Sequence, residues 1–302
     1  MTRRKLLLVG LILLGGVLAV STAAILIRLA IATAGVQNTG FSLFIAASRL
    51  VFASLLLLPA WRRLGQPSPQ SVQLAIAAGI TLALHFATWI TSLSLTSIAA
   101  STALVTTNPV WVALISWLCF RERLNKLGVL GISLALGGGI MIALGDPNPS
   151  NTAPNPLLGN CLALIGAWCA SGYLILGSQA QRHGLGISSY IAIAYTTAAL
   201  TLLPLPLLLG AGYTGYPLAV YGYIAIMALV SQVIGHTTLN WAVRQISPTM
   251  VALAVLFEPI AASLLGWLIF QEIPKSAVLL GASILLIGVA LAVLAQGKLT
   301  NK

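Results

Sequence analysis

The chain has 302 residues, of which 59% are hydrophobic and only 6% are charged, and its formal net charge is +11. Soluble domains carry about 25% charged residues, so this composition excludes a soluble globular protein and indicates an integral membrane protein. The positive charge does not indicate a nucleic-acid partner. The basic residues stand in short groups between apolar runs, and the sequence has no basic patch interleaved with aromatic residues.

Ten apolar runs follow one another along the chain, each near the roughly 20 residues that a membrane-spanning helix needs. Their approximate ranges are 6–31, 40–60, 71–93, 97–119, 126–144, 157–178, 187–209, 218–243, 247–270 and 276–295. The first run follows Arg-Arg-Lys and resembles a secretory signal peptide, but it continues past Ala24 and a comparable run opens near residue 157. We therefore expect it to remain as a helix, in an all-α integral membrane protein with ten transmembrane helices.

One stretch of the chain occurs twice: residues 109–138 align without a gap to residues 259–288. Identical residues occupy 11 of these 30 positions, namely Pro109/Pro259, Leu114/Leu264, Trp117/Trp267, Leu118/Leu268, Phe120/Phe270, Glu122/Glu272, Leu130/Leu280, Gly131/Gly281, Ser133/Ser283, Leu136/Leu286 and Gly138/Gly288. Composition does not explain matched Trp, Pro and Glu, so the chain contains an internal duplication. It predicts two five-helix repeats at 1–144 and 157–297, an external polar linker at 145–156 and a cytoplasmic tail at 298–302.

The orientation in the membrane follows from Lys and Arg in the short loops. With the N-terminus inside, twelve of the 15 basic residues fall on the cytoplasmic side and one, Lys275, falls outside, while Arg28 and Arg49 lie within apolar runs. We therefore expect a multi-pass protein of the cell membrane with both termini in the cytoplasm. Because each repeat has an odd number of helices, the second is inverted. Inverted repeats are typical of secondary transporters, whose substrate site lies near the midplane between them.

Three residues are expected near the middle of the membrane. Arg49 lies about 13 Å into its helix and Glu258 about 16 Å into its own, and Asn108 occupies the matching depth in the first repeat. A charge at this depth is costly and predicts a functional site. Two interpretations stay open: Arg49 and Glu258 either neutralise each other as a buried structural pair or bind substrate or a proton. Pro109 and Pro259 follow Asn108 and Glu258, and these prolines either break the helices along the substrate path or only shape packing.

Further polar and aromatic residues complete the predicted translocation path. His85 and His236 are near-equivalents in the repeat, and each is either part of a proton relay with Glu258 or a hydrogen-bonded packing group. Trp89 either anchors the helix at the membrane interface or caps a cavity. Tyr173 and Asn240 are assigned to the same path.

Other features of the sequence favour structural roles. Arg28 is expected near the outer surface, with its guanidinium extended toward the lipid headgroups. The runs at 126–144 and 276–295 are rich in glycine, which permits close helix packing in lipid, so they predict a scaffold or a homodimer contact. Cys119, Cys161 and Cys169 lack metal-ligand spacing and are interpreted as packing residues, with no cofactor or metal.

Several segments of the chain resemble the EamA-type domains of the drug/metabolite transporter superfamily. The resemblance rests on the duplicated segments, SRLVFASLLLLP around Arg49, TSIAASTALVTTNPVWVAL, and LNWAVRQISPTMVALAVLFEPIAA around Glu258. It implies ten helices, cytoplasmic termini, a central cavity and the movement of small metabolites, often outward. Asn108 at the position that corresponds to Glu258 implies an asymmetric site. The motifs of phosphate-sugar and nucleotide-sugar carriers are not matched.

The function that the sequence favours is secondary transport, in the export direction, by alternating access. The expected substrate is a small polar or amphiphilic metabolite such as an amino acid. The alternatives are an exporter of drugs or other hydrophobic compounds, a passive channel and a membrane scaffold. An enzyme is not expected, because Glu258 is the one carboxylate within an apolar run and the sequence has no paired carboxylates, HExxH, GxSxG or P-loop.

Overall fold

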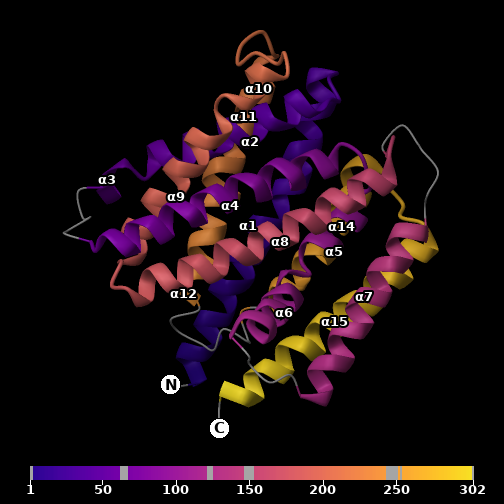
Figure 1. The fold of residues 1–302 in the computed structure, drawn as a ribbon. Helices are drawn as coiled ribbons and strands as arrows, with labels where there is room; N and C mark the ends of the chain where they lie inside the picture. Colours follow the sequence, from indigo (N-terminus) through magenta and orange to yellow (C-terminus); the bar gives the residue numbers. More distant parts are fainter. Residues whose placement is uncertain are drawn as a thin grey trace.

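The computed structural model describes residues 3–61, 67–120, 125–145, 153–242, 251 and 254–300. Secondary structure within these residues is helical throughout, without a β-strand. Figure 1 shows the helices packed as one bundle, in which α1 begins and α15 ends at the same end, while the connection between α10 and α11 lies at the opposite end.

The helices group into two sets of five spans over the described part of the chain. The first set is α1 (Arg3–Ala34), α2 (Thr39–Leu56) with α3 (Leu58–Trp61), α4 (Pro69–Leu93), α5 (Ile98–Val105) with α6 (Asn108–Phe120), and α7 (Lys126–Gly145). The second set is α8 (Pro156–Arg182), α9 (Ile187–Leu202) with α10 (Leu205–Leu208), α11 (Leu218–Ile226) with the π-helix η1 (Met227–His236) and α12 (Thr237–Ala242), α14 (Phe257–Phe270), and α15 (Ser276–Thr300). Eight helical segments are long and apolar enough to cross a membrane, and two shorter apolar helices, Lys126–Ile142 and Phe257–Phe270, complete the ten. The predicted ten-helix, two-repeat membrane fold is confirmed.

Polar residues at the ends of the apolar runs determine where several helices begin. Asn38, Ser68, Ser97 and Asn155 each accept a hydrogen bond from a backbone N–H in the first turn of the following helix. Such caps satisfy N–H groups that have no partner inside the helix. The boundaries of the spans therefore follow from local side-chain chemistry as well as from hydropathy.

The two repeats pack across each other in a reciprocal pattern. α1 packs against α11, η1 and α12, and its counterpart α8 packs against α4. In the same way α2 contacts η1 while α9 contacts α4, and α14 contacts α1 while α5 contacts α8. The pairs α2–α9 and α7–α15 each join a helix to its own counterpart, and the contact between α5 and α14 joins the two fourth spans. A twofold relation between the repeats produces such an exchange of partners, in keeping with two units of five spans that face opposite ways.

The glycines of α7 and α15 face each other. A Cβ atom at Gly131 would lie 2.5 Å from the backbone N of Ala292, and one at Gly138 would lie 2.5 Å from the backbone O of Gly281. The two helices run side by side in Figure 1 and need these glycines for their close approach. The glycine faces that suggested a homodimer contact are therefore used inside one chain, and that prediction loses its basis.

The fourth span of each repeat is interrupted at equivalent positions. In the first repeat, α5 ends at Val105 and α6 begins at Asn108, with Thr106 and Thr107 in a turn between them. In the second, the turn residue is Leu256, 150 positions after Thr106, and α14 begins at the next residue. The breaks lie two residues before Pro109 and three residues before Pro259, and a proline removes a backbone donor from the first turn of the helix that follows. The prediction that both prolines mark helix breaks agrees with these positions.

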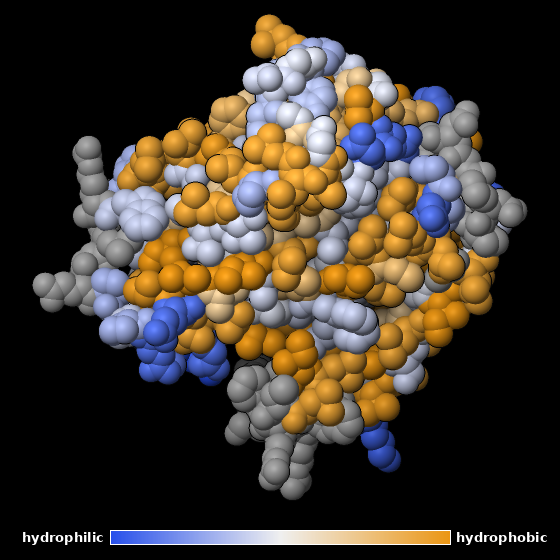
Figure 2. Space-filling view, turned by 45° about the horizontal axis from the view of Figure 1, so that its top comes forward, coloured by the Kyte–Doolittle hydropathy of each residue, from blue (hydrophilic) through white to orange (hydrophobic). Residues whose placement is uncertain are grey.

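The outside of the bundle is apolar. Figure 2 shows a face on which hydrophobic residues predominate and strongly hydrophilic residues gather toward the margins. Large aliphatic side chains such as Leu118, Leu208 and Leu218 are more than half exposed. A contiguous surface of this kind is unfavourable in water and suits contact with lipid chains.

Candidate functional site

Arg49 lies in the centre of the bundle with an exposed fraction of 0%. Its Nη2 atom donates a hydrogen bond to Oε1 of Gln232 on η1, at 2.6 Å. Its guanidinium carbon lies 4.3 Å from the centre of the Phe86 ring on α4. No described residue accepts a hydrogen bond from Nε or Nη1, and these atoms carry three of the five N–H donors of an arginine.

The surroundings of Arg49 compensate its charge only in part. Removing an ion from water costs several kcal/mol in a real protein. A desolvated cation–π contact such as the one with Phe86 returns about 2 kcal/mol, and a hydrogen bond that involves a charged group returns about 1.5–3 kcal/mol. The guanidinium of Arg49 is therefore a buried cation with unbonded N–H donors, and such a group is suited to binding an anion.

Glu258 lies in the first turn of α14 and is 9% exposed. It interacts electrostatically with Arg49, but the ion pair found among the described residues is Arg28–Glu272, not Arg49–Glu258. The hydrogen-bond partner of Arg49 among the described residues is Gln232, and both interpretations of Arg49 and Glu258, a buried structural pair or groups that bind substrate or a proton, stay predictions. The N-terminal end of a helix favours a negative charge, so α14 itself helps to hold the Glu258 carboxylate.

His85, Trp89 and His236 form an aromatic wall around Phe86. The Nδ1 atom of His85 donates to the carbonyl oxygen of Gly166 on α8 at 2.9 Å, which leaves Nε2 as the other ring nitrogen. The His85 ring stacks on Trp89, with centroids 6.0 Å apart, and His236 meets the Phe86 ring edge-on at 6.5 Å. Arg49, both histidines and Trp89 therefore lie in one cluster around Phe86.

The side chain of Trp89 is buried inside the bundle. It is only 4% exposed, and no described residue accepts a hydrogen bond from its indole N–H. A buried tryptophan usually finds a partner for this group. Trp89 is thus the second residue of the cluster around Phe86, after Arg49, with an unbonded donor.

The other predicted path residues have more limited contacts. The carbonyl oxygen of Asn108 accepts a hydrogen bond from the Ser171 hydroxyl at 3.0 Å, which ties the break in the fourth span to α8. Tyr173 stacks on Tyr190 with centroids 5.8 Å apart, and it interacts electrostatically with Tyr195 beside Arg49. Asn240 belongs to α12, but its side chain lies outside the described residues.

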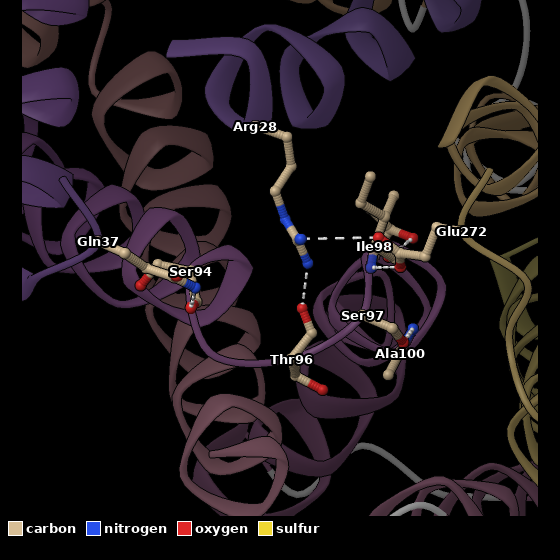
Figure 3. Close-up of polar contacts among 9 residues, drawn as sticks. Arg28, Gln37, Ser94, Thr96, Ser97, Ile98, Ala100 and Glu272 are labelled. Carbon is tan, nitrogen blue, oxygen red and sulfur yellow. Dashed lines mark hydrogen bonds and ion pairs between the residues drawn. The ribbon is translucent and has the colours of Figure 1, made fainter. Parts of the chain in front are cut away.

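A second polar cluster lies where α1 approaches the start of α5 (Figure 3). Arg28 donates from Nη2 to the carbonyl oxygen of Thr96 at 2.5 Å, and its Nη1 atom lies 3.6 Å from Oε2 of Glu272. The Oε1 atom of Glu272 accepts from the backbone N–H of Ile98 at 2.7 Å, at the start of α5. Arg28 was predicted to extend toward the lipid headgroups. It is instead 8% exposed, and its guanidinium points into the protein, toward the Thr96 carbonyl and Glu272.

Comparison with known proteins assigns the chain to a family. The model of the EamA-like transporter family matches residues 7–144 and 157–294, which together make up most of the chain. The chain belongs to the EamA-like transporter family. It is therefore a membrane transporter of the drug/metabolite transporter superfamily.

One curated protein and one solved structure are similar to this chain. The "Uncharacterized transporter YyaM" of Bacillus subtilis (strain 168) is 22% identical over 184 residues, which span 60% of this chain and 60% of that relative. A solved structure described as "Crystal structure of protein" matches 96% of this chain and 98% of its own, with a TM-score of 0.62 and 20% sequence identity. At this identity the likeness shows the shared fold alone.

Three residues of the central site in this EamA-like transporter were missed by sequence reasoning. They are Gln232, Phe86 and Tyr195. The dipeptide Ser231-Gln232 is a polar interruption of the run at 218–243 and is a signal that can be read from the sequence. It falls in η1, and π-helical turns are frequent at functional sites.

Among the described residues, no group of His, Cys, Asp and Glu side chains could hold a metal ion. The polar chemistry that the described side chains of this EamA-like transporter offer at its centre is a guanidinium, two imidazoles, an indole N–H and one carboxylate. These groups can bind an organic anion or a zwitterion and move a proton.

Proposed function

We propose that this transporter exports a small amphiphilic metabolite that carries a carboxylate, such as an amino acid, and that Arg49 binds the carboxylate. The observation that supports this most is the fully buried guanidinium with Nε and Nη1 unbonded. A substrate carboxylate can accept a charge-assisted hydrogen bond from either of these nitrogens, and such bonds are shorter and stronger than those between neutral groups.

The groups around Arg49 suit the rest of such a substrate. The rings of Phe86, His85 and Trp89 offer an apolar surface to the side chain of the substrate. Glu258, which interacts electrostatically with Arg49, offers a negative charge to an ammonium group. A hydrophobic drug without an anionic group would leave the charge of Arg49 uncompensated, so the carboxylate substrate is favoured over that alternative.

Transport in this proposal follows alternating access. The two repeats exchange partners across the bundle, and rocking of one against the other exposes the Arg49 site to each side of the membrane in turn. The distribution of Lys and Arg favours cytoplasmic termini. Protonation of Glu258, with His85 and His236 as relay groups, couples export to the proton gradient.

The test compares metabolites released by cells that produce the wild-type protein, the Arg49→Gln variant or the Arg182→Gln variant. Arg182 is an exposed residue at the end of α8, so its variant controls for the same chemical change. We expect the exported compounds to carry a carboxylate, and we expect export to fall about thirty-fold or more in Arg49→Gln only. This follows because loss of one partner of a buried charge pair costs about 2–5 kcal/mol. Wild-type export by Arg49→Gln, or export of cationic hydrophobic compounds alone, would refute the proposal.

A further inference from the structure

A pocket opens at the end of the bundle where α1 ends. It has a volume of about 310 Å³ and is lined by Arg28, Ile31, Ala32, Val36, Gln37 and Phe270, among others. Its polar lining therefore comes from one guanidinium and one carboxamide, and its remaining walls are aliphatic and aromatic. This pocket is separate from the Arg49 cluster, with which it shares no residue.

Arg28 brings unused hydrogen-bonding capacity to this pocket. The residue is 8% exposed, and no described residue accepts a hydrogen bond from its Nε atom. The Oε2 atom of Glu272 is likewise buried without a hydrogen-bond partner, since its 3.6 Å separation from Nη1 of Arg28 is too long for one. The charge of Arg28 is thus met by a loose ion pair that a better-placed anion can replace.

Glu272 is held in place from the other side. Its Oε1 atom accepts a hydrogen bond from the backbone N–H of Ile98 at 2.7 Å, at the N-terminus of α5, where the helix dipole favours a negative charge. Glu272 can therefore release Arg28 without losing its own anchor. Figure 3 shows this arrangement, with Arg28 reaching from α1 toward both Thr96 and Glu272.

The geometry points to a second binding site in this pocket, for an organic carboxylate with an apolar body, whose carboxylate competes with Glu272 for Arg28. Nη1 of Arg28, released from Glu272, binds the anion, while Ile31, Val36 and Phe270 contact the apolar part. The class of ligand rests on the proposed function. A carboxylate that leaves the central site toward the end of the bundle where α1 ends would meet this pocket. Occupancy would also loosen the contact between α1 and the α14–α15 connection that Arg28 and Glu272 now make.

The test uses a thiol placed beside the pocket. Ala32 lines the pocket, is exposed, and lies one helical turn after Arg28 on the same face of α1. The Ala32→Cys variant is made in a chain whose Cys119, Cys161 and Cys169 are replaced by Ser, and it is reacted with an anionic sulfonatoethyl or a cationic trimethylammonioethyl methanethiosulfonate. Thr214→Cys, in the exposed loop at the same end of the bundle, is the matched control. Sodium benzoate is the probe ligand and benzamide its neutral control.

We expect the anionic reagent to react about tenfold faster than the cationic one in Ala32→Cys, because the guanidinium lies close by. No such preference is expected in Thr214→Cys. Benzoate, but not benzamide, slows labelling of Ala32→Cys. When Arg28→Gln is introduced into the Ala32→Cys chain, we expect both the preference for the anionic reagent and the protection by benzoate to disappear. Arg28→Lys in the same chain restores the preference. Glu272→Gln lowers the benzoate concentration that is needed for protection.

Three results would overturn the second site. The first is an equal rate with both reagents in Ala32→Cys, and the second is protection by benzoate that survives Arg28→Gln. The third is protection that disappears in Arg49→Gln, since the probe would then act from the central site. Protection that persists in Arg49→Gln separates this pocket from the proposed function, because that function is tested by export and not by labelling at position 32.

Discussion

The two buried arginines of this transporter differ in what surrounds their charges. Arg28 has a carboxylate of its own chain within 3.6 Å and a backbone carbonyl in hydrogen-bond contact. Arg49 has a neutral amide and an aromatic ring. A ligand must therefore compete with Glu272 for Arg28, whereas Arg49 has no directly bonded anion to displace. Arg49, whose charge is compensated less well than that of Arg28, is therefore the stronger candidate for the substrate site.

The two buried arginines also differ from the residues at the equivalent positions of the second repeat. The positions 150 residues after Arg28 and Arg49 are Ser178 and Ala199, so neither arginine has a basic counterpart in the second repeat. The scaffold is nearly symmetric, and the two buried cations among the described residues both belong to the first repeat. Departures from the repeat pattern therefore mark the polar sites.

The largest expected effect concerns Glu258, the carboxylate that interacts with Arg49 without pairing with it. Replacing Glu258 by Gln keeps the size of the side chain and removes its ability to ionise. We expect proton-driven export by Glu258→Gln to fall about thirty-fold or more, while exchange of labelled for unlabelled substrate across liposome membranes continues. Normal net export, or wild-type flux that is insensitive to collapse of the proton gradient, would remove Glu258 from the coupling mechanism.

A smaller effect separates the two arginines by stability. Arg28→Met leaves Glu272 and the Thr96 carbonyl without their partner, so we expect a loss of about 2 kcal/mol in the free energy of unfolding. Arg49→Met replaces a poorly compensated charge by an apolar chain of similar length, and we expect unchanged or increased stability. Thermal unfolding of both purified variants in the same detergent measures the difference. A larger loss in Arg49→Met than in Arg28→Met would show that Arg49 is a structural residue.

The smallest effect separates the two roles of Glu272. Gln at this position keeps an oxygen that accepts from the Ile98 N–H, whereas Ala removes it, so Glu272→Ala should be less stable than Glu272→Gln by about 1 kcal/mol, the usual value of a helix cap. Thermal unfolding of the two variants side by side is the measurement. Equal stability would mean that the contact with Ile98 does not stabilise α5.

Much of the fold could be predicted from the sequence, because the signals are local or duplicated. The lengths of the apolar runs predicted ten spans, and the pairs Pro109/Pro259 and Trp117/Trp267 revealed the repeat. The depth of Arg49 along its helix was enough to predict a charge buried in the middle of the bundle. These inferences use only the rise of a helix and the cost of burying a charge.

The partners of the buried charges could not be predicted in the same way. Gln232 lies 183 residues from Arg49, and the sequence does not state which face of its helix points inward. Apolar residues surround the polar ones on all sides of the spans, so the usual amphipathic pattern that fixes helix rotation in soluble proteins is weak here. The pairing of Arg28 with Glu272 and the π-helical turn around Gln232 depend on how the repeats pack.

The central claim is that the free donors of Arg49 bind the carboxylate of the transported molecule. The most direct test is an experimental structure of the purified transporter with an exported carboxylate bound. We expect a carboxylate oxygen within hydrogen-bond distance of Nε or Nη1 of Arg49, with the apolar part of the molecule against Phe86 and Trp89. A substrate bound elsewhere in the bundle, with Nε and Nη1 of Arg49 still unbonded, would contradict the claim.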